Sequence, residues 1–131
     1  MSEIEARLAA QGIILPTPVA PVANYVPYAR TGDVIHISGQ VSVDENGGIR
    51  GVVGEDVDFE SAVFAARLCA INLIAQMKAA CGGDLSQVRR VVKLGGFVQA
   101  GPNFFDIPKV VNGASDLMVD IFGDAGRHAR S

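Results

Sequence analysis

One apolar helix in the middle of the sequence constrains the rest of the fold. Apolar side chains step by three and four residues from Val63 to Cys81, which places them on one face of a helix predicted over residues 59–80. Asp58 is a suitable N-cap, and Gly82-Gly83 ends the helix. Because this face is rich in alanine, the helix can pack closely against a sheet.

Segments with strand patterns lie on both sides of this helix. Three short strands with turns between them are predicted before it, at residues 25–30, 34–38 and 49–53, and one longer strand after it, at residues 88–98. The pair Gly95-Gly96 in the longer strand indicates a bulge or a close backbone approach. A second helix is predicted from Phe105 to Phe122. This order predicts an α+β fold with a mostly antiparallel sheet and two helices on one face.

The chain of 131 residues is predicted to form a single domain, residues 1–131. Residues 1–22 form its N-terminal part, a short helix at 3–11 followed by an extended arm with three prolines in six residues. The second face of the predicted sheet has no helix to cover it. Since 49% of the residues are hydrophobic, we expect this face to pack against other copies of the chain.

Charge and hydropathy argue against several classes of protein. A net charge of −3 argues against a nucleic-acid partner, which normally needs a basic surface. No segment has the uninterrupted apolar length of a membrane span, and no signal peptide is recognised, so we expect a cytoplasmic protein without a membrane partner. Cys69 and Cys81 are about 18 Å apart along one helix and cannot pair with each other.

The sequence lacks the common motifs for metals, cofactors and nucleophiles. His36 and His128 are isolated, with no second ligand at metal spacing, and each is interpreted as a structural histidine. There is no phosphate-binding Gly-Lys-Ser/Thr loop and no Gly-x-Ser-x-Gly elbow. We therefore expect no metal and no cofactor.

Four polar motifs remain, and each is weak on its own. They are Asn24-Tyr25, Ser38-Gly39-Gln40, Val111-Asn112-Gly113 and Ala129-Arg130-Ser131. Arginine is the side chain best suited to bind a carboxylate, because its planar fork makes two parallel hydrogen bonds. Taken alone, Arg127 and Arg130 would be solvated residues of a tail.

In their order and spacing, the four motifs resemble the Rid family, whose members are YjgF-like and often described as endoribonuclease L-PSP-like. The resemblance covers roughly residues 20–131 and is closest to a longer subgroup outside the RidA type. It implies a chorismate-mutase-like α+β subunit in a homotrimer. It also implies a further strand after Ser131, which in the family carries a glutamate that helps to position water.

The resemblance also implies a reaction and a site. RidA-type members hydrolyse reactive 2-imino and 2-enamino acids to 2-oxo acids and ammonia, so the partner would be a small 2-imino or 2-oxo acid. By position, Arg130 would hold the substrate carboxylate and Tyr25 would line the pocket as the second catalytic candidate. The pocket would lie between adjacent subunits, bordered by the substrate-binding candidates Ser38, Gly39, Asn112 and Ser131.

Three functions stay open from the sequence. The first is an imine or enamine deaminase, and the second is a protein of the same fold that binds a small carboxylate without turnover. The third is an endoribonuclease or translation inhibitor. The negative charge, the aromatic content of 6% and the absence of a histidine pair count against the third.

Overall fold

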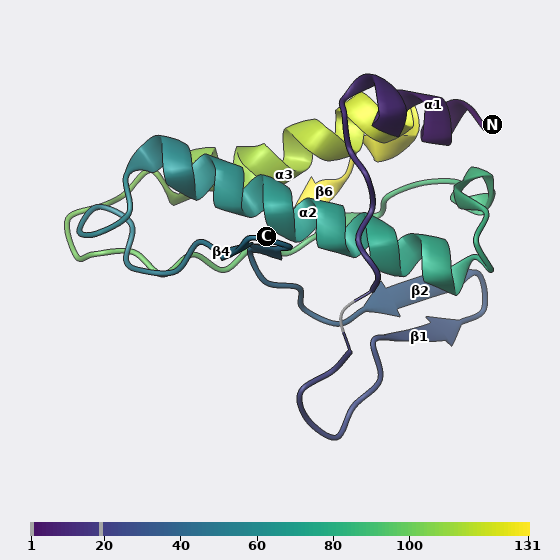
Figure 1. Cartoon of the computed structure of the whole chain (residues 1–131), viewed down its shortest axis with the longest axis horizontal. Helices are drawn as coiled ribbons and strands as arrows, with labels where there is room; N and C mark the ends of the chain where they lie inside the picture. The colour runs from purple at the N-terminus through teal and green to yellow at the C-terminus, as the bar shows by residue number, and fades with distance from the viewer. Residues whose placement is uncertain (1, 19) are drawn as a thin grey trace.

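The computed structural model describes residues 2–18 and 20–131, and two long helices lie side by side in it (Figure 1). Helix α2 spans Phe59–Ala80 and helix α3 spans Ile107–Phe122. A shorter helix, α1, spans Glu3–Ala10, and the short 3-10 helices η1 and η2 span Leu85–Gln87 and Gly123–Gly126. The predicted bounds of α2 are confirmed, whereas α3 begins two residues later than predicted, with a proline in its first turn.

The N-terminus of α2 is fixed by the predicted cap. The Asp58 carboxylate accepts a hydrogen bond from the Ser61 backbone N–H at 2.8 Å. The hydrogen bond from the Ser61 backbone, and to a smaller extent the one from the Ser61 hydroxyl, hold the pKa of Asp58 below its ordinary value of 3.8. The charged carboxylate also faces the positive end of the helix dipole, which favours this helix start.

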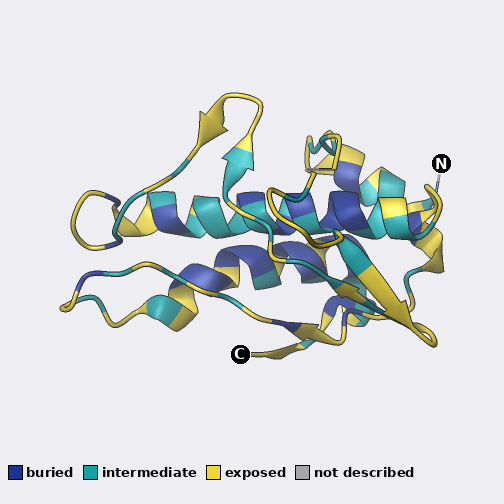
Figure 2. Ribbon diagram, turned by 90° about the horizontal axis from the view of Figure 1, so that it is seen from below, coloured by how far each residue is buried: buried dark blue, intermediate teal, exposed yellow. Residues whose placement is uncertain are grey.

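The main core lies where α2 packs on α3. Ile74 of α2 and Leu117, Met118 and Ile121 of α3 are fully buried in it. The two backbones approach closely at Gly113, since a Cβ added there would lie 2.1 Å from the Val63 carbonyl oxygen. Figure 2 shows the same distribution, with buried residues concentrated on the long helices and exposed ones on the hairpins.

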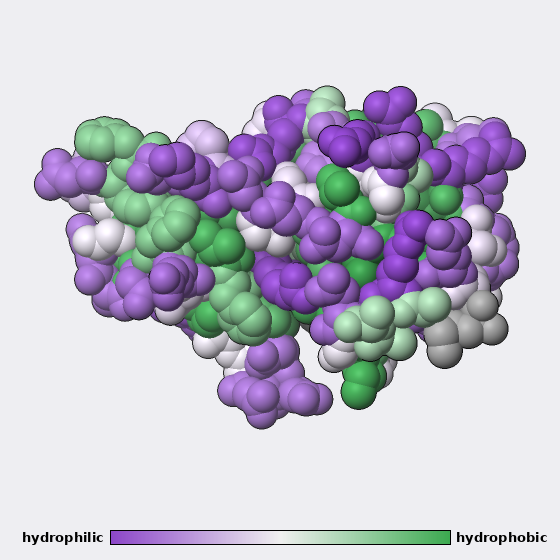
Figure 3. Space-filling view, turned by 90° about the horizontal axis from the view of Figure 1, so that it is seen from above, coloured by the Kyte–Doolittle hydropathy of each residue, from purple (hydrophilic) through white to green (hydrophobic). Residues whose placement is uncertain are grey.

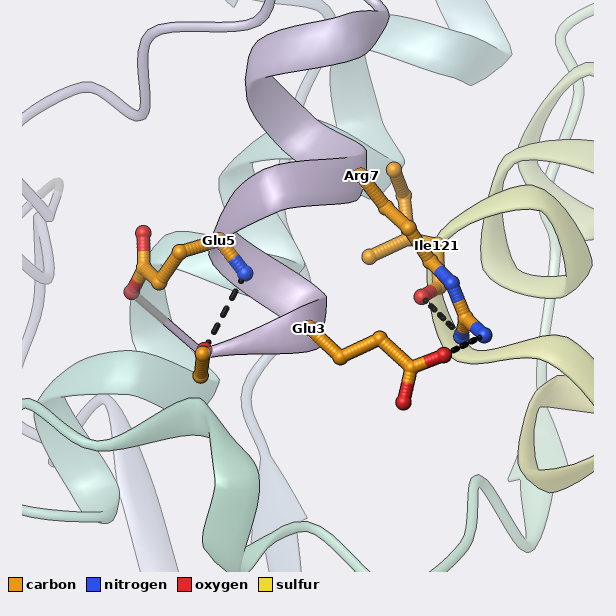
Figure 4. Close-up of polar contacts among 5 residues, drawn as sticks. Glu3, Glu5, Arg7 and Ile121 are labelled. Atoms are coloured by element: carbon orange, nitrogen blue, oxygen red, sulfur yellow. Dashed lines mark hydrogen bonds and ion pairs between the residues drawn. The ribbon is translucent and has the colours of Figure 1, made fainter.

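Helix α1 is attached to both long helices by charged side chains. Arg7 donates to the Ile121 carbonyl at the end of α3, at 3.0 Å, and pairs with Glu3 on its own helix (Figure 4). Lys78 of α2 pairs with Glu5 at 3.2 Å. A cation beside the last carbonyls of α3 favours that helix end, so α1 closes one end of the helical layer.

The strands are shorter than predicted and form separate pairs. Among the described residues, β1 (Tyr28–Thr31) pairs antiparallel with β2 (Val34–Ile37), and β3 (Val43–Asp44) pairs antiparallel with β4 (Gly47–Gly48). β5 (Lys93–Leu94) pairs parallel with β6 (Ala129–Arg130). The α+β class is therefore confirmed, but the single, mostly antiparallel sheet is wrong for these residues.

The differences from the predicted strands have local causes. The predicted strand at 25–30 begins only at Tyr28, because Pro27 has no N–H to donate. The predicted strand at 49–53 is replaced by β4 and by single bridges from Val53 to Val57 and Ala100. In the predicted strand at 88–98, only Lys93 and Leu94 form a ladder, because β6 is the one strand beside this segment among the described residues.

The chain around β5 nevertheless keeps the alternation of a strand. Leu94 is buried, and the Val111 side chain packs over Gly96, where an added Cβ would lie 2.9 Å from it. This confirms the close approach predicted at Gly95-Gly96. Phe97 points to the opposite side and is fully exposed, at 102%. The outer face of this segment is therefore uncovered.

An open groove of about 1640 Å³ separates β2 from β5, with apolar side chains of α2 in its lining. Along a strand, successive residues direct their backbone N–H and C=O to opposite sides. The N–H and C=O of Ile35 and Ile37 therefore point away from β1, and those of Lys93 and Gly95 point away from β6. The groove thus has two strand edges directed into it. That a further strand after Ser131 completes the sheet stays a prediction.

Apolar groups also lie on the face of the molecule that Figure 3 shows. Figure 3 shows the helical side, where green apolar patches interrupt the purple hydrophilic surface. Among the described helices, α2 is long and apolar enough to cross a membrane by length and composition, but its buried Ala70 and Ile74 belong to the core that it forms with α3. Cys69 and Cys81 are free, and burial raises the pKa of the Cys69 thiol, as expected for a packing residue.

Candidate anion site at Arg130

Arg130 lies on β6 and extends along one face of α3. The partners of β6 fix its backbone: Ala129 N–H donates to the Val92 carbonyl at 3.1 Å, and Ser131 N–H to the Leu94 carbonyl at 3.0 Å. The guanidinium then reaches three acceptors on α3, which belong to Pro108, Asn112 and Ser115. These positions follow the i, i+4, i+7 spacing of one helix face.

These acceptors bind only one part of the guanidinium. Nη1 donates to Asn112 Oδ1 at 2.6 Å and to Ser115 Oγ at 3.2 Å, and Nη2 donates to the Pro108 carbonyl at 3.0 Å. A guanidinium has five N–H donors. Within the described part of the chain, these contacts leave Nε–H and one of the two Nη2–H groups, and the Nε and Nη2 atoms lie on the same edge of the guanidinium. That edge has the geometry for bidentate binding of a carboxylate.

No acidic side chain of residues 2–18 and 20–131 forms an ion pair with Arg130. Its acceptors are a backbone carbonyl, an amide oxygen and a hydroxyl, all of them neutral. By contrast, Arg127 pairs with Asp124 at 3.4 Å and Arg30 with Asp33 at 3.3 Å. The guanidinium is therefore held in place by neutral groups while its charge is available to an anion.

Ser115 is also hydrogen-bonded to His128. The Nε2 atom of His128 lies 2.8 Å from Ser115 Oγ, and its Nδ1 atom lies 2.6 Å from the Gly126 carbonyl oxygen. Since a carbonyl oxygen can only accept, Nδ1 carries a proton, and in the neutral ring Nε2 is the acceptor of the Ser115 hydroxyl proton. A continuous chain of hydrogen bonds thus runs from Gly126 through His128 and Ser115 to Arg130.

A depression of about 250 Å³ opens beside this chain of hydrogen bonds. Ser115, His128 and Arg130 line it, together with Val119 and Arg127. Ser115 and His128 are half-buried and Arg130 is exposed. The depression can admit a small molecule with a negative group.

The remaining predicted site residues form a second group. The Ser38 hydroxyl donates to the Val26 carbonyl at 2.7 Å, which joins the end of β2 to the segment that contains Tyr25. Tyr25 is 48% exposed, and Gly39 lines the groove between β2 and β5. Among the described residues, no hydrogen bond connects this group to Arg130. The structure therefore joins Arg130 to Asn112, and it joins Ser38 to Val26, the residue next to Tyr25. It does not join these two groups to each other within the described part of one chain.

Ser131 contributes through its backbone. Its N–H bonds to Leu94 and its carbonyl accepts from Gly96 N–H at 2.9 Å. Arg130 is thereby held between two backbone-anchored neighbours. Within residues 2–18 and 20–131, no three His, Cys, Asp or Glu side chains lie close enough together to hold a metal ion.

A family model described as "YjgF/chorismate_mutase-like, putative endoribonuclease" matches residues 5–131, which include every residue of the Arg130 site. The chain belongs to this family. The resemblance inferred from the four motifs is confirmed, and with it the chorismate-mutase-like fold.

Similar proteins extend over almost the whole chain. Protein TCP17 of Trypanosoma cruzi is 44% identical over 129 residues, covering 97% of this chain and 80% of the relative. The structure of protein Atu1372 from Agrobacterium tumefaciens is 47% identical, with a TM-score of 0.92 over 98% of this chain and 79% of that one. A Shewanella oneidensis structure described as a "putative endoribonuclease" is 38% identical, with a TM-score of 0.93 over 97% of this chain and 84% of its own. This YjgF-like chain thus spans about four fifths of the length of these relatives.

Three participants in the Arg130 site were not predicted from the sequence. Pro108 acts through its carbonyl, and Ser115 and His128 are 13 residues apart. The helical spacing of positions 108, 112 and 115 was a signal that could have placed Ser115 beside Asn112. Nothing in the sequence indicated the contact of His128, because it depends on the turn at η2.

Proposed function

We propose that this YjgF-like protein hydrolyses small 2-imino acids to 2-oxo acids and ammonia, with Arg130 holding the substrate carboxylate. The observation that carries the proposal is the arrangement of the Arg130 guanidinium. Neutral acceptors on α3 orient it, and no carboxylate of the described residues pairs with it. Both substrate and product of this reaction carry a carboxylate next to the reacting carbon.

The modest set of side chains is compatible with this chemistry. An imine carbon is already electrophilic, so hydrolysis needs an oriented substrate, a placed water and a route for protons. A strong nucleophile or a metal is not required. Arg130 supplies the orientation, since a bidentate bond fixes both the position and the plane of the carboxylate.

We further propose that the complete site forms between subunits of a homotrimer. Tyr25 and Ser38 are grouped apart from Arg130 within one chain, and an adjacent copy can bring its Tyr25 group to this Arg130. The uncovered side of β5 supports such an assembly, because Phe97 is fully exposed there, at 102%.

Replacing Phe97 by aspartate should prevent this assembly, because the interface would then have to bury a charge. Light scattering after size exclusion should give wild type a mass three times the 13.7 kDa of one subunit and the variant the mass of one subunit. The control is Phe64→Asp, on the exposed side of α2 and 49% exposed. A monomeric wild type would contradict the trimer.

The deaminase proposal is tested by trapping the imine. An amino-acid oxidase generates 2-iminopropanoate, semicarbazide traps it, and the protein, expressed from its natural start to its natural stop codon, should suppress formation of the semicarbazone. Binding of a 2-oxo acid without suppression would favour a carboxylate-binding protein without turnover. Cleavage of RNA that persists after contaminating nucleases are removed would favour the endoribonuclease named in the family description. No suppression with any imine tested would contradict the deaminase.

A further inference from the structure

Arg130 is exposed, so its guanidinium needs partners that hold it in one orientation. A free arginine side chain has many rotamers in water, and a ligand that immobilises it must offset the loss of this freedom. Exposed ion pairs are weak for the same reason. Contacts that fix the guanidinium before a ligand arrives therefore strengthen the binding of a carboxylate.

The contact with Ser115 lies outside the edge of Arg130 that keeps free donors. Nε and Nη2 form that free edge, whereas Ser115 Oγ accepts from Nη1 at 3.2 Å. A carboxylate on the free edge leaves the contact with Ser115 intact and lies away from it. Ser115 therefore acts on such a ligand through the position of the guanidinium, without touching the ligand itself.

His128 determines where the Ser115 hydroxyl points. Serine hydroxyls on helices commonly donate back to a carbonyl of the preceding turn. Here the proton goes to Nε2 of His128, 2.8 Å from Ser115 Oγ, because the Gly126 carbonyl, 2.6 Å from Nδ1, keeps the ring proton on Nδ1. A hydroxyl that donates in this way is also a better acceptor, and its oxygen accepts from Arg130 Nη1.

We propose that His128 is a positioning residue, which acts through Ser115 to fix the Arg130 guanidinium for carboxylate binding. This role rests on the proposed function, because it requires the substrate carboxylate to bind at Arg130. His128 does not touch the substrate, and its ring neither gains nor loses a proton during the reaction. The site needs at this position only an acceptor for the Ser115 hydroxyl.

The first test compares side chains with and without that acceptor at position 128. His128→Leu should raise the Kd for 2-oxobutanoate, measured by calorimetry, about fivefold, the effect of losing one hydrogen bond. His128→Asn should do the same, because its shorter amide keeps a donor near the Nδ1 position but does not reach Ser115. In His128→Gln the amide oxygen reaches the Nε2 position and accepts the same proton, so this variant should stay within about twofold of wild type.

The matched control is His36→Leu, at the exposed histidine of β2, which should leave the Kd unchanged. In the His128 variants the kcat for 2-iminopropanoate should stay within about twofold of wild type while KM rises, because a contact made equally in the ground state and the transition state changes KM alone. Thermal unfolding of each variant shows that the comparison is made between folded proteins.

A double-mutant cycle tests whether His128 acts through Ser115. Ser115→Ala alone should raise the Kd for 2-oxobutanoate about fivefold. In the Ser115→Ala background, His128→Leu should have no further effect, whereas two independent effects would multiply.

The outcomes separate this role from the proposed function. A wild type that binds 2-oxobutanoate and a His128→Leu variant that binds it equally well would overturn the positioning role and leave the proposed function standing. Effects that multiply in the double mutant would overturn the role as well, and so would a large fall in kcat at unchanged Kd. A wild type that binds no 2-oxobutanoate would contradict the proposed function itself, and the positioning role with it.

Discussion

Replacing Arg130 with alanine should lower kcat/KM for 2-imino acids by about 30- to 1,000-fold and weaken 2-oxo acid binding by a similar factor. This corresponds to about 2–4 kcal/mol, the range for truncating one member of a hydrogen-bonded charge pair. The loss of binding is large because the alanine variant has no cation in the position that the three acceptors on α3 give to the Arg130 guanidinium. Steady-state kinetics and calorimetry on the same preparations measure both effects.

Arg130→Lys separates the effect of the positive charge on binding from the effect of the planar guanidinium. A lysine keeps the positive charge but cannot make two parallel, coplanar hydrogen bonds, so most of the loss should remain. Arg30→Ala is the control, because Arg30 is an exposed arginine paired with Asp33 on the β1–β2 hairpin. Equal kinetics for Arg130→Ala and Arg30→Ala would remove Arg130 from the site.

Gly113→Ala should destabilise the protein by about 3 kcal/mol, even though alanine is the better helix former by about 1 kcal/mol. An added Cβ would lie 2.1 Å from the Val63 carbonyl oxygen, and this backbone atom cannot rotate away. Helices α2 and α3 would have to separate along the main core. We expect the thermal midpoint to fall by about 10 °C.

The control for this substitution is Gly95→Ala. Gly95 lies beside β5, and a Cβ added there would have no neighbouring atom within 4 Å, so an alanine meets no obstacle. Its midpoint should stay within about 2 °C of wild type. A Gly113→Ala protein as stable as wild type would contradict the close crossing of the two helices.

The helices could be predicted because their signals are local. Asp58 accepts the Ser61 N–H, and the glycines after Cys81 end the helix, so the sequence defines α2 to the residue. The strands depend on neighbours distant in sequence. The segment 88–98 has the composition of a strand throughout, yet it forms a ladder only at Lys93 and Leu94, where β6 lies beside it.

The site was predictable in part for the same reason. Arg130 and Asn112 were predicted together from motif order, and the structure joins them at 2.6 Å. His128 was interpreted as structural because no second ligand stands at metal spacing. Its contact with Ser115 forms because the chain turns at η2 and runs back along α3. A tertiary contact of this kind produces no periodic pattern in the sequence. The role of Tyr25, and the subunit interface that it would require, stay predictions.

The most direct test of this account is a crystal structure of the protein with 2-oxobutanoate bound. The account predicts the ligand carboxylate on the free edge of Arg130, with one oxygen on Nε and the other on Nη2, and with the bonds from Asn112, Ser115 and Pro108 retained. A carboxylate bound elsewhere, with the Nε edge of Arg130 facing only solvent, would contradict the central claim.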